Sequence, residues 1–390
     1  MSVIRVALIW ESLPWRGGIN YYRNLCSAVA QLPDSRIKII LFTGKSVDTH
    51  ELETLVEVVR LPILERKSVP WFFWKLGVKA GRDVLLYQHM RNYHIDIISH
   101  FPSLWKGCPI PSIPWVADFQ FLRLPDMFGE KETKSMVKYY EHVCKREKYL
   151  FVSSNDAKKD LYHFVGNGVC PVTYVLQFVS SPVAQDDVLS KQDLIDKYYL
   201  PANWFHLPNQ FWKHKNHQVV IEALSKIKAQ GKDVYVVATG NTTDFRNPDH
   251  YQNLMKIVEQ TGIGNNFISL GEIPYADVVA LMAYSIAVIN PSFFEGWSTT
   301  VEEAKALGKK IILSDIPIHR EQNPFRKVFF APKDSNQLAE ILLNELKGYS
   351  LDIEKSLQVD AKRKNANAVV EFAQYYERIL LNIVLSKLHR

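Results

Sequence analysis

Two glutamates, Glu295 and Glu303, stand eight residues apart in the stretch PSFFEGWSTTVEEAKALG of residues 291–308. Eight residues turn an ideal helix by roughly 80° beyond two full turns, so both carboxylates can hold one ligand only if Glu295 lies in a loop. Gly296 marks such a loop between the two glutamates. The free backbone N–H groups and the positive end of the helix dipole at such a helix start favour an anion, and phosphate is the obvious ligand.

The flanking residues predict the elements that would position these glutamates. Residues 286–289 and 311–313 are unbroken apolar runs typical of strands buried on both faces. Between them the sequence predicts a helix with Thr299 or Thr300 as N-cap, Glu302 or Glu303 three residues on, and Gly308 at the C′ position. The alternative is a purely structural role, in which the helix is amphipathic and Glu303 only closes a capping box with Thr300.

A second candidate group is the basic cluster Lys213, His214, Lys215 and His217, which follows a strand beginning near Phe205. Positive charge at a strand end suits a diphosphate leaving group, where negative charge builds up as a bond breaks. The alternative is an ordinary solvated run of charges. No carboxylate or cysteine stands at metal-ligand spacing from the histidines, so no metal site is expected.

Three further strand ends carry candidate residues. Gly17 and Gly18 follow a strand over residues 3–10, and such a glycine pair either lets a ligand approach the backbone or simply makes a turn. Asp118 follows a strand over residues 113–116, where a carboxylate can serve as general base, substrate anchor or helix cap. Gly271, Glu272 and Ile273 follow a strand over residues 267–270.

Length and composition limit the architecture and the class of protein. The chain has 390 residues, 47% of them hydrophobic and 23% charged, which indicates a globular protein of two domains. Alternating strands and helices predict two doubly wound α/β domains. The net charge of +6 favours anionic ligands, but no nucleic-acid-binding motif accompanies it.

The cysteines and the apolar runs indicate in which cellular compartment the protein is expected. Cys26, Cys108, Cys144 and Cys170 show no CxxC spacing and fit reduced thiols in a cytosolic protein. No apolar run reaches the roughly 18 residues of a membrane span. The N-terminus reads as a first strand and not as a signal peptide.

The stretch from Glu295 to Gly308 resembles the signature EG(F/W)(G/S)xxxxEAxAxG of retaining glycosyltransferases of GT-B fold, family 4, also called glycosyl transferases group 1. The resemblance implies that Glu295 contacts the sugar of a nucleotide diphosphate donor and that Glu303 binds the ribose hydroxyls. It also implies that backbone amides hold the diphosphate, and these belong to Trp297, Ser298, Thr299 and Thr300. Ser298 and Lys305 depart from the usual Gly and Met without removing a functional group.

Outside this signature the resemblance carries over to further residues. Lys215 matches a lysine that contacts the diphosphate, but the usual arginine is absent. Asn209 and Gln210 occupy its neighbourhood, and Lys213 is a candidate for the missing charge. Asp118 matches the polar residue of an HD-like acceptor loop whose histidine is Ala117 here.

Two glycine-containing segments and the chain end also match. The resemblance implies that Gly17 and Gly18 lie against the donor phosphate or the acceptor, and that Gly271 to Ile273 contact the nucleotide base through the backbone. The implied domains are residues 1–178 for the acceptor, a linker over 179–204, and residues 205–365 for the donor, with a helix over 366–390 crossing back to the first domain. The implied fold is GT-B, with two Rossmann-like domains facing across a cleft.

Residues 66–82 combine four aromatic residues, Trp71 to Trp74, with lysines and arginines. This composition suits a helix in a membrane interface, which would fit an enzyme acting on lipid-linked sugars at the inner face of a membrane. The alternative is a helix whose aromatic residues pack in the core while its lysines stay in water.

The resemblance implies a retaining, metal-independent hexosyltransferase that uses no cofactor, with a UDP- or GDP-sugar as donor and a saccharide or lipid-linked hydroxyl as acceptor. Asp118, Lys215 and Glu295 are its predicted catalytic residues. Two alternatives stay open. The first is a catalytically silent GT-B protein that binds a nucleotide sugar or a partner enzyme, and the second is a nucleotide-sugar epimerase of similar fold.

Overall fold

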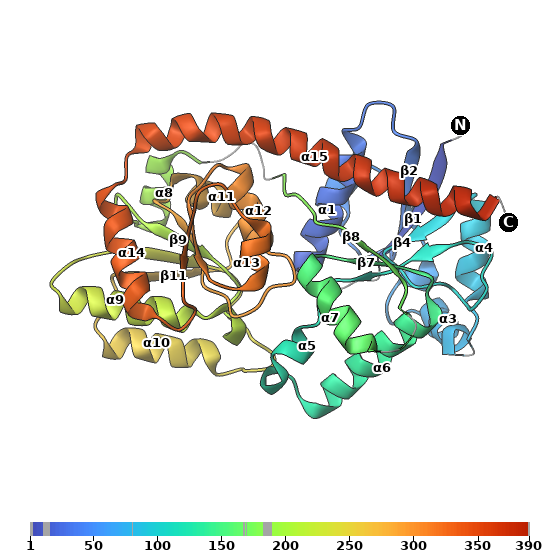
Figure 1. Ribbon diagram of the computed structural model, residues 1–390, viewed down its shortest axis with the longest axis horizontal. Helices are drawn as coiled ribbons and strands as arrows, with labels where there is room; N and C mark the ends of the chain where they lie inside the picture. Colours follow the sequence, from blue (N-terminus) through green and yellow to red (C-terminus); the bar gives the residue numbers. More distant parts are fainter. Residues whose placement is uncertain are drawn as a thin grey trace. The chain divides into compact units, whose positions relative to one another are not determined.

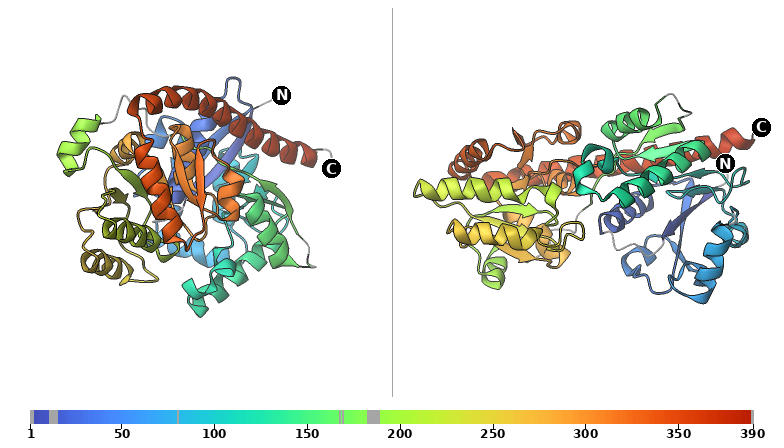
Figure 2. Two further views of the ribbon diagram at one scale, coloured as in Figure 1. Left: turned by 60° about the vertical axis from the view of Figure 1, so that its left-hand side comes forward. Right: turned by 90° about the horizontal axis from the view of Figure 1, so that it is seen from below.

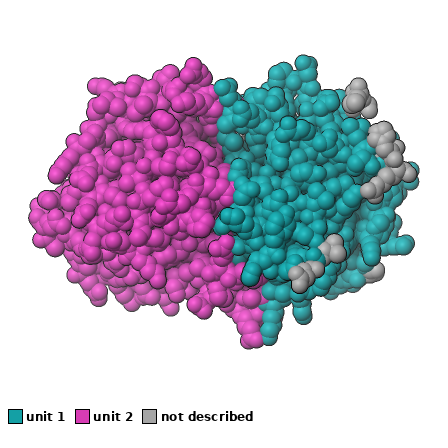
Figure 3. Space-filling view, in the orientation of Figure 1, with its two compact units in different colours: residues 1–119, 134–179, 367–390 teal, residues 120–133, 180–366 magenta. Residues whose placement is uncertain are grey.

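The computed structural model of the chain describes residues 3–10, 16–79, 81–166, 168, 170–181 and 189–388. Two compact units emerge, coloured separately in Figure 3. Unit 1 comprises residues 1–119, 134–179 and 367–390, and unit 2 comprises residues 120–133 and 180–366.

Unit 1 contains a five-stranded parallel sheet of order β3-β2-β1-β4-β5 and a three-stranded parallel sheet of order β6-β7-β8. The strands are β1 (Ile4–Trp10), β2 (Ile37–Thr43), β3 (Glu57–Arg60), β4 (Ile97–Ser99), β5 (Ser112–Ile113), β6 (Trp115–Val116), β7 (Tyr149–Val152) and β8 (Val172–Val175). The single strand predicted over 113–116 is split between the two sheets, because Pro114 has no N–H to continue the ladder while its carbonyl accepts from the Phe151 amide.

Unit 2 contains a six-stranded parallel sheet of order β11-β10-β9-β12-β13-β14. Its strands are β9 (Phe205–Pro208), β10 (Val236–Thr239), β11 (Phe267–Gly271), β12 (Val288–Asn290), β13 (Ile311–Ser314) and β14 (Lys327–Phe330). The chain order reverses between β9 and β12, which is where ligands bind in doubly wound sheets. Helices alternate with these strands along the chain, so the predicted alternation is confirmed.

Helices connect these strands (Figures 1 and 2). Those of unit 1 include α1 (Arg16–Ala30), α2 (His50–Glu53), α3 (Val69–Lys79), α4 (Val84–Asn92), α6 (Glu130–Arg146, which begins in unit 2) and α7 (Asn155–Val165). Those of unit 2 include α5 (Gln120–Arg123), α8 (Lys191–Tyr198), α9 (His217–Ala229), α10 (His250–Gln260), α11 (Tyr275–Tyr284), α12 (Thr299–Ala306), α13 (Pro317–Gln322) and α14 (Ser335–Lys347). The last helix, α15 (Leu351–Leu388), contributes to both units.

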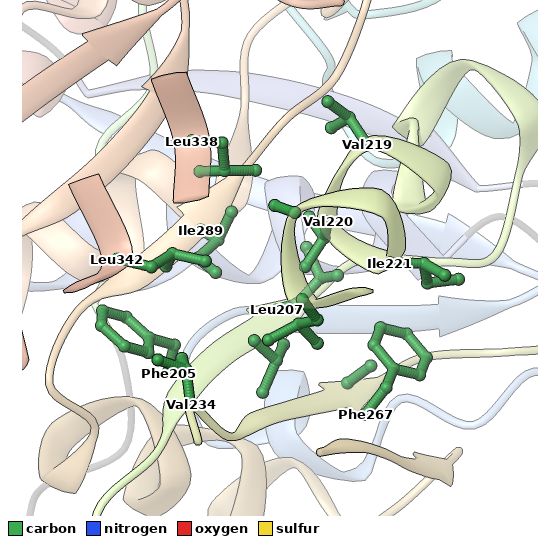
Figure 4. Close-up of a cluster of buried hydrophobic side chains, with 14 of the residues drawn as sticks. Phe205, Leu207, Val219, Val220, Ile221, Val234, Phe267, Ile289, Leu338 and Leu342 are labelled. Atoms are coloured by element: carbon green, nitrogen blue, oxygen red, sulfur yellow. The ribbon is translucent and has the colours of Figure 1, made fainter. Parts of the chain in front are cut away.

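The core of unit 2 follows from the period of two along buried strands. Ile312 of β13 packs with the helices α9, α10 and α14, whereas its neighbours Ile311 and Leu313 pack with α11 and α12. Figure 4 shows the first of these clusters, in which Phe205 and Leu207 of β9 lie among side chains of α9 and α14. Each fully buried side chain of this size stabilises the fold by about 1.5–3 kcal/mol. Both faces of the sheet are therefore covered, and its edge at the strand ends is left for function.

Several element boundaries differ from the expectations. The first helix begins at Arg16, so Gly17 and Gly18 lie in its first turn and not in a loop, while the predicted loop residues 11–15 lie outside the described residues. The expected linker contains α8, whose Leu194 is fully buried in unit 2. The last helix starts at Leu351, well before residue 366.

Candidate functional site

The candidate site of unit 2 is built by two loops that leave adjacent strands. Val288 of β12 pairs with His206 of β9, so the loops after both strands emerge at the same edge of the sheet. The β9 loop carries Lys215, and the β12 loop carries Glu295. The Phe293 amide donates to the His214 carbonyl at 2.8 Å, which ties the two loops together.

Lys215 and Glu295 form an ion pair in these loops. The Lys215 Nζ lies 2.7 Å from Oε1 and 2.8 Å from Oε2 of Glu295, and the Ser292 hydroxyl donates to Oε1 at 2.6 Å. Glu295 is only 9% exposed. Two candidate residues that are 80 positions apart in the sequence are therefore in direct contact.

The electrostatics of the pair follow from its surroundings. Burial alone would raise the pKa of Glu295, but the charge and hydrogen bonds of Lys215, together with the Ser292 hydroxyl, lower it to about 2. Glu295 is thus ionised at neutral pH. Because the pair compensates its own charge, Lys215 is available to an incoming anion only by exchanging one carboxylate for another negative group.

The N-cap of α12 differs from the prediction. Ser298, and not Thr299 or Thr300, caps the helix, because its hydroxyl accepts from the Val301 amide. Asn290 donates to that hydroxyl at 2.8 Å. Thr299 and Thr300 are the first helical residues, and Gly308 follows the C-cap with a φ of 67°, as the prediction of a C′ glycine requires.

The Gln322 side chain is hydrogen-bonded to the backbone of Ser298 at the start of α12. Its Oε1 accepts from the Ser298 amide at 3.2 Å, and its Nε2 donates to the Ser298 carbonyl at 3.0 Å. The Ser298 amide, expected on a diphosphate, is therefore engaged within the protein. Trp297 precedes the cap, and Thr299 and Thr300 are the first two residues of α12. The contact of their amides with a diphosphate stays a prediction.

Glu303 lies near the segment predicted to contact a nucleotide base. The Tyr275 hydroxyl donates to Glu303 Oε1 at 2.6 Å, and Tyr275 begins α11 after the N-cap Pro274, which follows Gly271 to Ile273. The structure thus brings the second glutamate of the motif next to this segment. Tyr275 has no signal in the sequence that would have identified it.

The positive charge of the β9 loop is smaller than its sequence suggests. His214 and His217 are buried, and burial lowers the pKa of each to about 3, so both are neutral at pH 7. Lys213 is exposed, and its amide donates to Asp244 at 3.1 Å. Among the described residues no group of three His, Cys, Asp or Glu side chains could hold a metal ion.

Asn209 and Gln210, which stand in place of an arginine, tie strand ends together. Asn209 donates to the Asn290 side chain at 3.2 Å, and Gln210 accepts from the Asn241 amide at 2.9 Å. Their side chains therefore hold the loops of β9, β10 and β12 in register. Neither supplies a charge.

The remaining candidates belong to unit 1, which is described by itself. Asp118 follows β6, as predicted, and its backbone carbonyl accepts from the Tyr140 hydroxyl at 3.2 Å. Gly18 is buried in the first turn of α1. All four cysteines are free, and two of them, Cys26 and Cys144, are buried.

Comparison with known families identifies the C-terminal half. Residues 203–365 match the family model described as "Glycosyl transferases group 1". This range contains Lys215, Glu295 and Glu303. It confirms the family resemblance for the part of the chain that forms the candidate site.

Two curated relatives match part of the chain. An N,N'-diacetylbacillosaminyl-diphospho-undecaprenol alpha-1,3-N-acetylgalactosaminyltransferase of Campylobacter jejuni is 28% identical over 126 residues, covering 30% of this chain and 34% of the relative. The O-antigen chain mannosyltransferase RfbU of Salmonella typhimurium is 25% identical over 158 residues, covering 40% of this chain and 42% of the relative. The matches thus span less than half the length of these relatives.

Solved structures match over nearly the whole chain. A glycosyltransferase from Rickettsia africae has a TM-score of 0.66 at 18% identity, covering 99% of this chain and 98% of that one. Anabaena Alr3699/HepE, crystallised with UDP and glucose, has a TM-score of 0.67 at 16% identity, covering 97% and 100%. At such identities the likeness shows the fold, which is the expected GT-B fold.

Proposed function

Residues 203–365 form a domain of the glycosyl transferases group 1 family within a chain of GT-B fold, and from this premise we propose that the protein is a retaining glycosyltransferase. It transfers a hexose from a UDP- or GDP-sugar to a hydroxyl of a saccharide or lipid-linked acceptor. The observation that carries the proposal is the ion pair of the partly buried Lys215 with the buried Glu295, at the point where the strand order reverses.

In the proposed reaction, the bond between the anomeric carbon and the phosphate oxygen breaks, and the acceptor oxygen bonds to the anomeric carbon on the same face. The acceptor proton passes to the leaving phosphate. Lys215 leaves Glu295 to neutralise this phosphate, while Glu295 takes a sugar hydroxyl in exchange. Developing charge in a buried site is where a fixed cation lowers the barrier most.

The other candidate residues bind substrates in this proposal. Glu303 accepts from the ribose hydroxyls, and Gly271, Glu272 and Ile273 contact the base. Amides at the start of α12 and Lys213 contact the diphosphate. Asp118, Gly17 and Gly18 of unit 1 serve the acceptor side. We include no metal ion or cofactor in the reaction.

The substrate classes rest on the relatives. Anabaena HepE was also crystallised with UDP-glucose, and the two curated relatives are named for transfer to an undecaprenol-linked sugar and to an O-antigen chain. We therefore propose that the protein acts in the assembly of a surface polysaccharide or glycoconjugate. A cytoplasmic location is proposed because its four cysteines are free.

A donor panel tests this function. UDP-glucose, UDP-N-acetylgalactosamine and GDP-mannose are screened by thermal shift, since a bound ligand raises the melting temperature by mass action. Nucleoside diphosphate release is then measured with an acceptor panel. Lys215→Ala should lower turnover by about 100-fold, and Glu303→Ala should weaken donor binding by about tenfold. Lys228→Ala, at the surface pair with Asp233, is the matched control.

The same assay separates the alternatives. Donor binding without release of nucleoside diphosphate would indicate a silent binding protein, which the missing arginine charge at Asn209 and Gln210 would explain. A new sugar nucleotide from donor alone would indicate an epimerase. Unchanged kinetics in both site variants would discredit the assigned roles.

A specific surface of unit 1 favours membrane contact as part of this function. In α3, Val69, Phe72, Phe73 and Leu76 are 71%, 57%, 62% and 47% exposed. Their spacing places them on one face of the helix. Among the described residues, no helix is both long and apolar enough to span a bilayer.

The opposite face of α3 holds the helix to the protein. Trp74 is 1% exposed and donates to Asp83 at 2.7 Å. The aromatic residues are therefore divided, with Trp74 in the core and both phenylalanines outside. Since the exposed basic residues Arg66, Lys67, Lys79 and Arg82 flank the apolar face, we propose an anionic lipid surface as its partner.

Vesicle flotation tests the membrane contact. The protein should float with vesicles rich in phosphatidylglycerol and not with phosphatidylcholine vesicles, and less so at high salt. Replacing both Phe72 and Phe73 by Ser should abolish flotation, whereas Phe325→Ser, at a side chain 86% exposed in unit 2, should not. Flotation that survives the double variant would exclude α3 as the contact.

A further inference from the structure

His319 in α13 is a buried residue with one nitrogen unused. Its side chain is 0% exposed, and Nδ1 lies 2.8 Å from the Ser314 carbonyl oxygen. A carbonyl can only accept, so Nδ1 carries the proton and Nε2 presents a lone pair. Within the part of the chain that the structure describes, Nε2 has no hydrogen-bond partner.

The lone pair persists at neutral pH. Burial lowers the pKa of His319, and the nearby charge of Lys215 acts in the same direction. The charge of Glu295 and the hydrogen bond to the Ser314 backbone oppose these effects without reversing them. His319 is therefore a neutral imidazole that can accept a hydrogen bond.

Two serines connect His319 to the ion pair. The Ser314 hydroxyl lies 3.2 Å from His319 Nδ1 and donates to the Ser292 carbonyl at 2.5 Å. The Ser292 hydroxyl in turn donates to Glu295 at 2.6 Å. The histidine thus belongs to the same network as Glu295, at the end of the strand next to β12.

A buried acceptor without a partner costs about 1–3 kcal/mol. A ligand that donates a hydrogen bond to it removes this cost, so the ligand gains affinity over an analogue that lacks the donor. Nothing else in the described network of Ser292, Ser314 and Glu295 offers a free donor to Nε2, because both serine hydroxyls donate elsewhere.

We propose that His319 is a specificity-determining residue whose Nε2 accepts a hydrogen bond from a hydroxyl of the sugar held at Glu295. This inference rests on the proposed function and adds a residue to the sugar part of the donor site. It implies that His319 distinguishes a nucleotide sugar from the bare nucleoside diphosphate.

Two substitutions separate the roles of the two nitrogens. His319→Asn keeps an N–H near the position of Nδ1, so it can still donate to Ser314, but it removes the acceptor at Nε2. His319→Gln restores a polar group near Nε2. His206→Gln is the matched control, because His206 is also 0% exposed and contacts the Thr239 hydroxyl through Nε2, and its Nδ1 has no partner among the residues that the structure describes.

The measurement is calorimetric binding of UDP and UDP-glucose, and of GDP and GDP-mannose, to each full-length variant. In His319→Asn, the preference for the nucleotide sugar over its diphosphate should fall by about tenfold, while the affinity for the diphosphate changes less than about twofold. His319→Gln should recover part of the preference. His206→Gln should leave it unchanged.

The outcomes distinguish this inference from the proposed function. If the unsubstituted protein binds no nucleotide sugar, the proposed function fails first, and the inference fails with it. If it binds one and His319→Asn weakens sugar and diphosphate equally, His319 has no specificity role. A lower melting temperature with unchanged preference would show that Nε2 only holds the structure, through a buried water, and would overturn the inference.

Discussion

The two units share a strand order around their first strand, but they differ in what fills the edge where that order reverses. In unit 1, the end of β4 carries a network in which His100 uses both ring nitrogens, at 2.6 Å from the Tyr21 hydroxyl and 2.8 Å from the Ser99 hydroxyl. Tyr376 donates to Ser99, and Tyr21 stacks on Trp115.

The corresponding edge of unit 2 carries the ion pair of Lys215 and Glu295, and a His319 Nε2 that has no hydrogen-bond partner among the described residues. The difference teaches that the strand order alone does not make a site. In unit 1 the side chains satisfy each other, which stabilises the fold. In unit 2 one buried acceptor, His319 Nε2, has no partner among the described residues, so a ligand can donate a hydrogen bond to it.

The largest expected effect is on the acid stability of unit 2. Because the folded pKa of Glu295 is lowered to about 2, its ionised form stabilises the fold above pH 4.5, and this contribution is lost as the pH falls towards 2. The difference in free energy of unfolding between the unsubstituted protein and Glu295→Gln should shrink by about 2 kcal/mol between pH 6 and pH 3. Urea unfolding measured at each pH gives this difference.

Glu302 provides a control of opposite sign in the same helix. Burial raises its pKa, although Lys305 and Gln322 oppose this effect. Its ionised form therefore disfavours folding above its unfolded pKa, and Glu302→Gln should gain stability relative to the unsubstituted protein as the pH rises. If both glutamine variants showed the same pH dependence, the Lys215–Glu295 pair would not set the charge of the site.

The next effect concerns how tightly the strand ends of unit 2 are held. Gly240 has a φ of 142°, and a Cβ added there would lie 2.4 Å from the Asn209 carbonyl oxygen. Gly240→Ala must therefore displace the loop that leads to Lys215, and it should cost about 2 kcal/mol more than Gly262→Ala. Gly262 also has a positive φ, but a Cβ there would meet nothing.

Binding measurements give this comparison its functional meaning. Gly240→Ala should weaken UDP-glucose binding beyond its effect on folding, whereas Gly262→Ala should not. Equal costs of the two substitutions would mean that the β9 loop adjusts freely and that close contact with Gly240 does not fix the position of Lys215.

The sequence predicted the parts of the fold and site that depend on local patterns. Buried parallel strands read as apolar runs, so β12 and β13 were found within two residues. The pattern of strand, glycine-containing loop and helix between them placed Glu295 in a loop and Glu303 in a helix. Strand ends of a parallel sheet gather at one edge, which is why Lys215 was a candidate before its contact with Glu295 was known.

The remainder depended on contacts between distant residues. Thr299 and Thr300 were predicted as caps instead of Ser298, because no carboxylate stands three residues after Ser298. In the structure Ser298 is the cap, and hydrogen bonds to Asn290 and Gln322 hold it in place. His319 and Tyr275 lie in ordinary helical sequence, and only the fold brings them to the glutamates. His214 and His217 looked positive, but burial, which no local pattern reveals, makes them neutral.

The smallest expected effect tests the hydrogen-bond network around His100 in unit 1. Tyr21→Phe removes the partner of His100 Nε2 in a buried site, which should cost about 1–2 kcal/mol in the free energy of unfolding. Tyr376→Phe should cost about 1 kcal/mol, because Ser99 keeps its contact with His100. Urea unfolding measures both, with Tyr139→Phe at a half-exposed side chain as control.

Tyr21→Phe leaves His100 Nε2 without its hydroxyl partner, so it resembles His319 Nε2. The variant should lower stability while leaving the affinities for UDP and UDP-glucose unchanged. A loss of sugar binding in this variant would show that the His100 network supports donor binding, and it would contradict the contrast between the two networks.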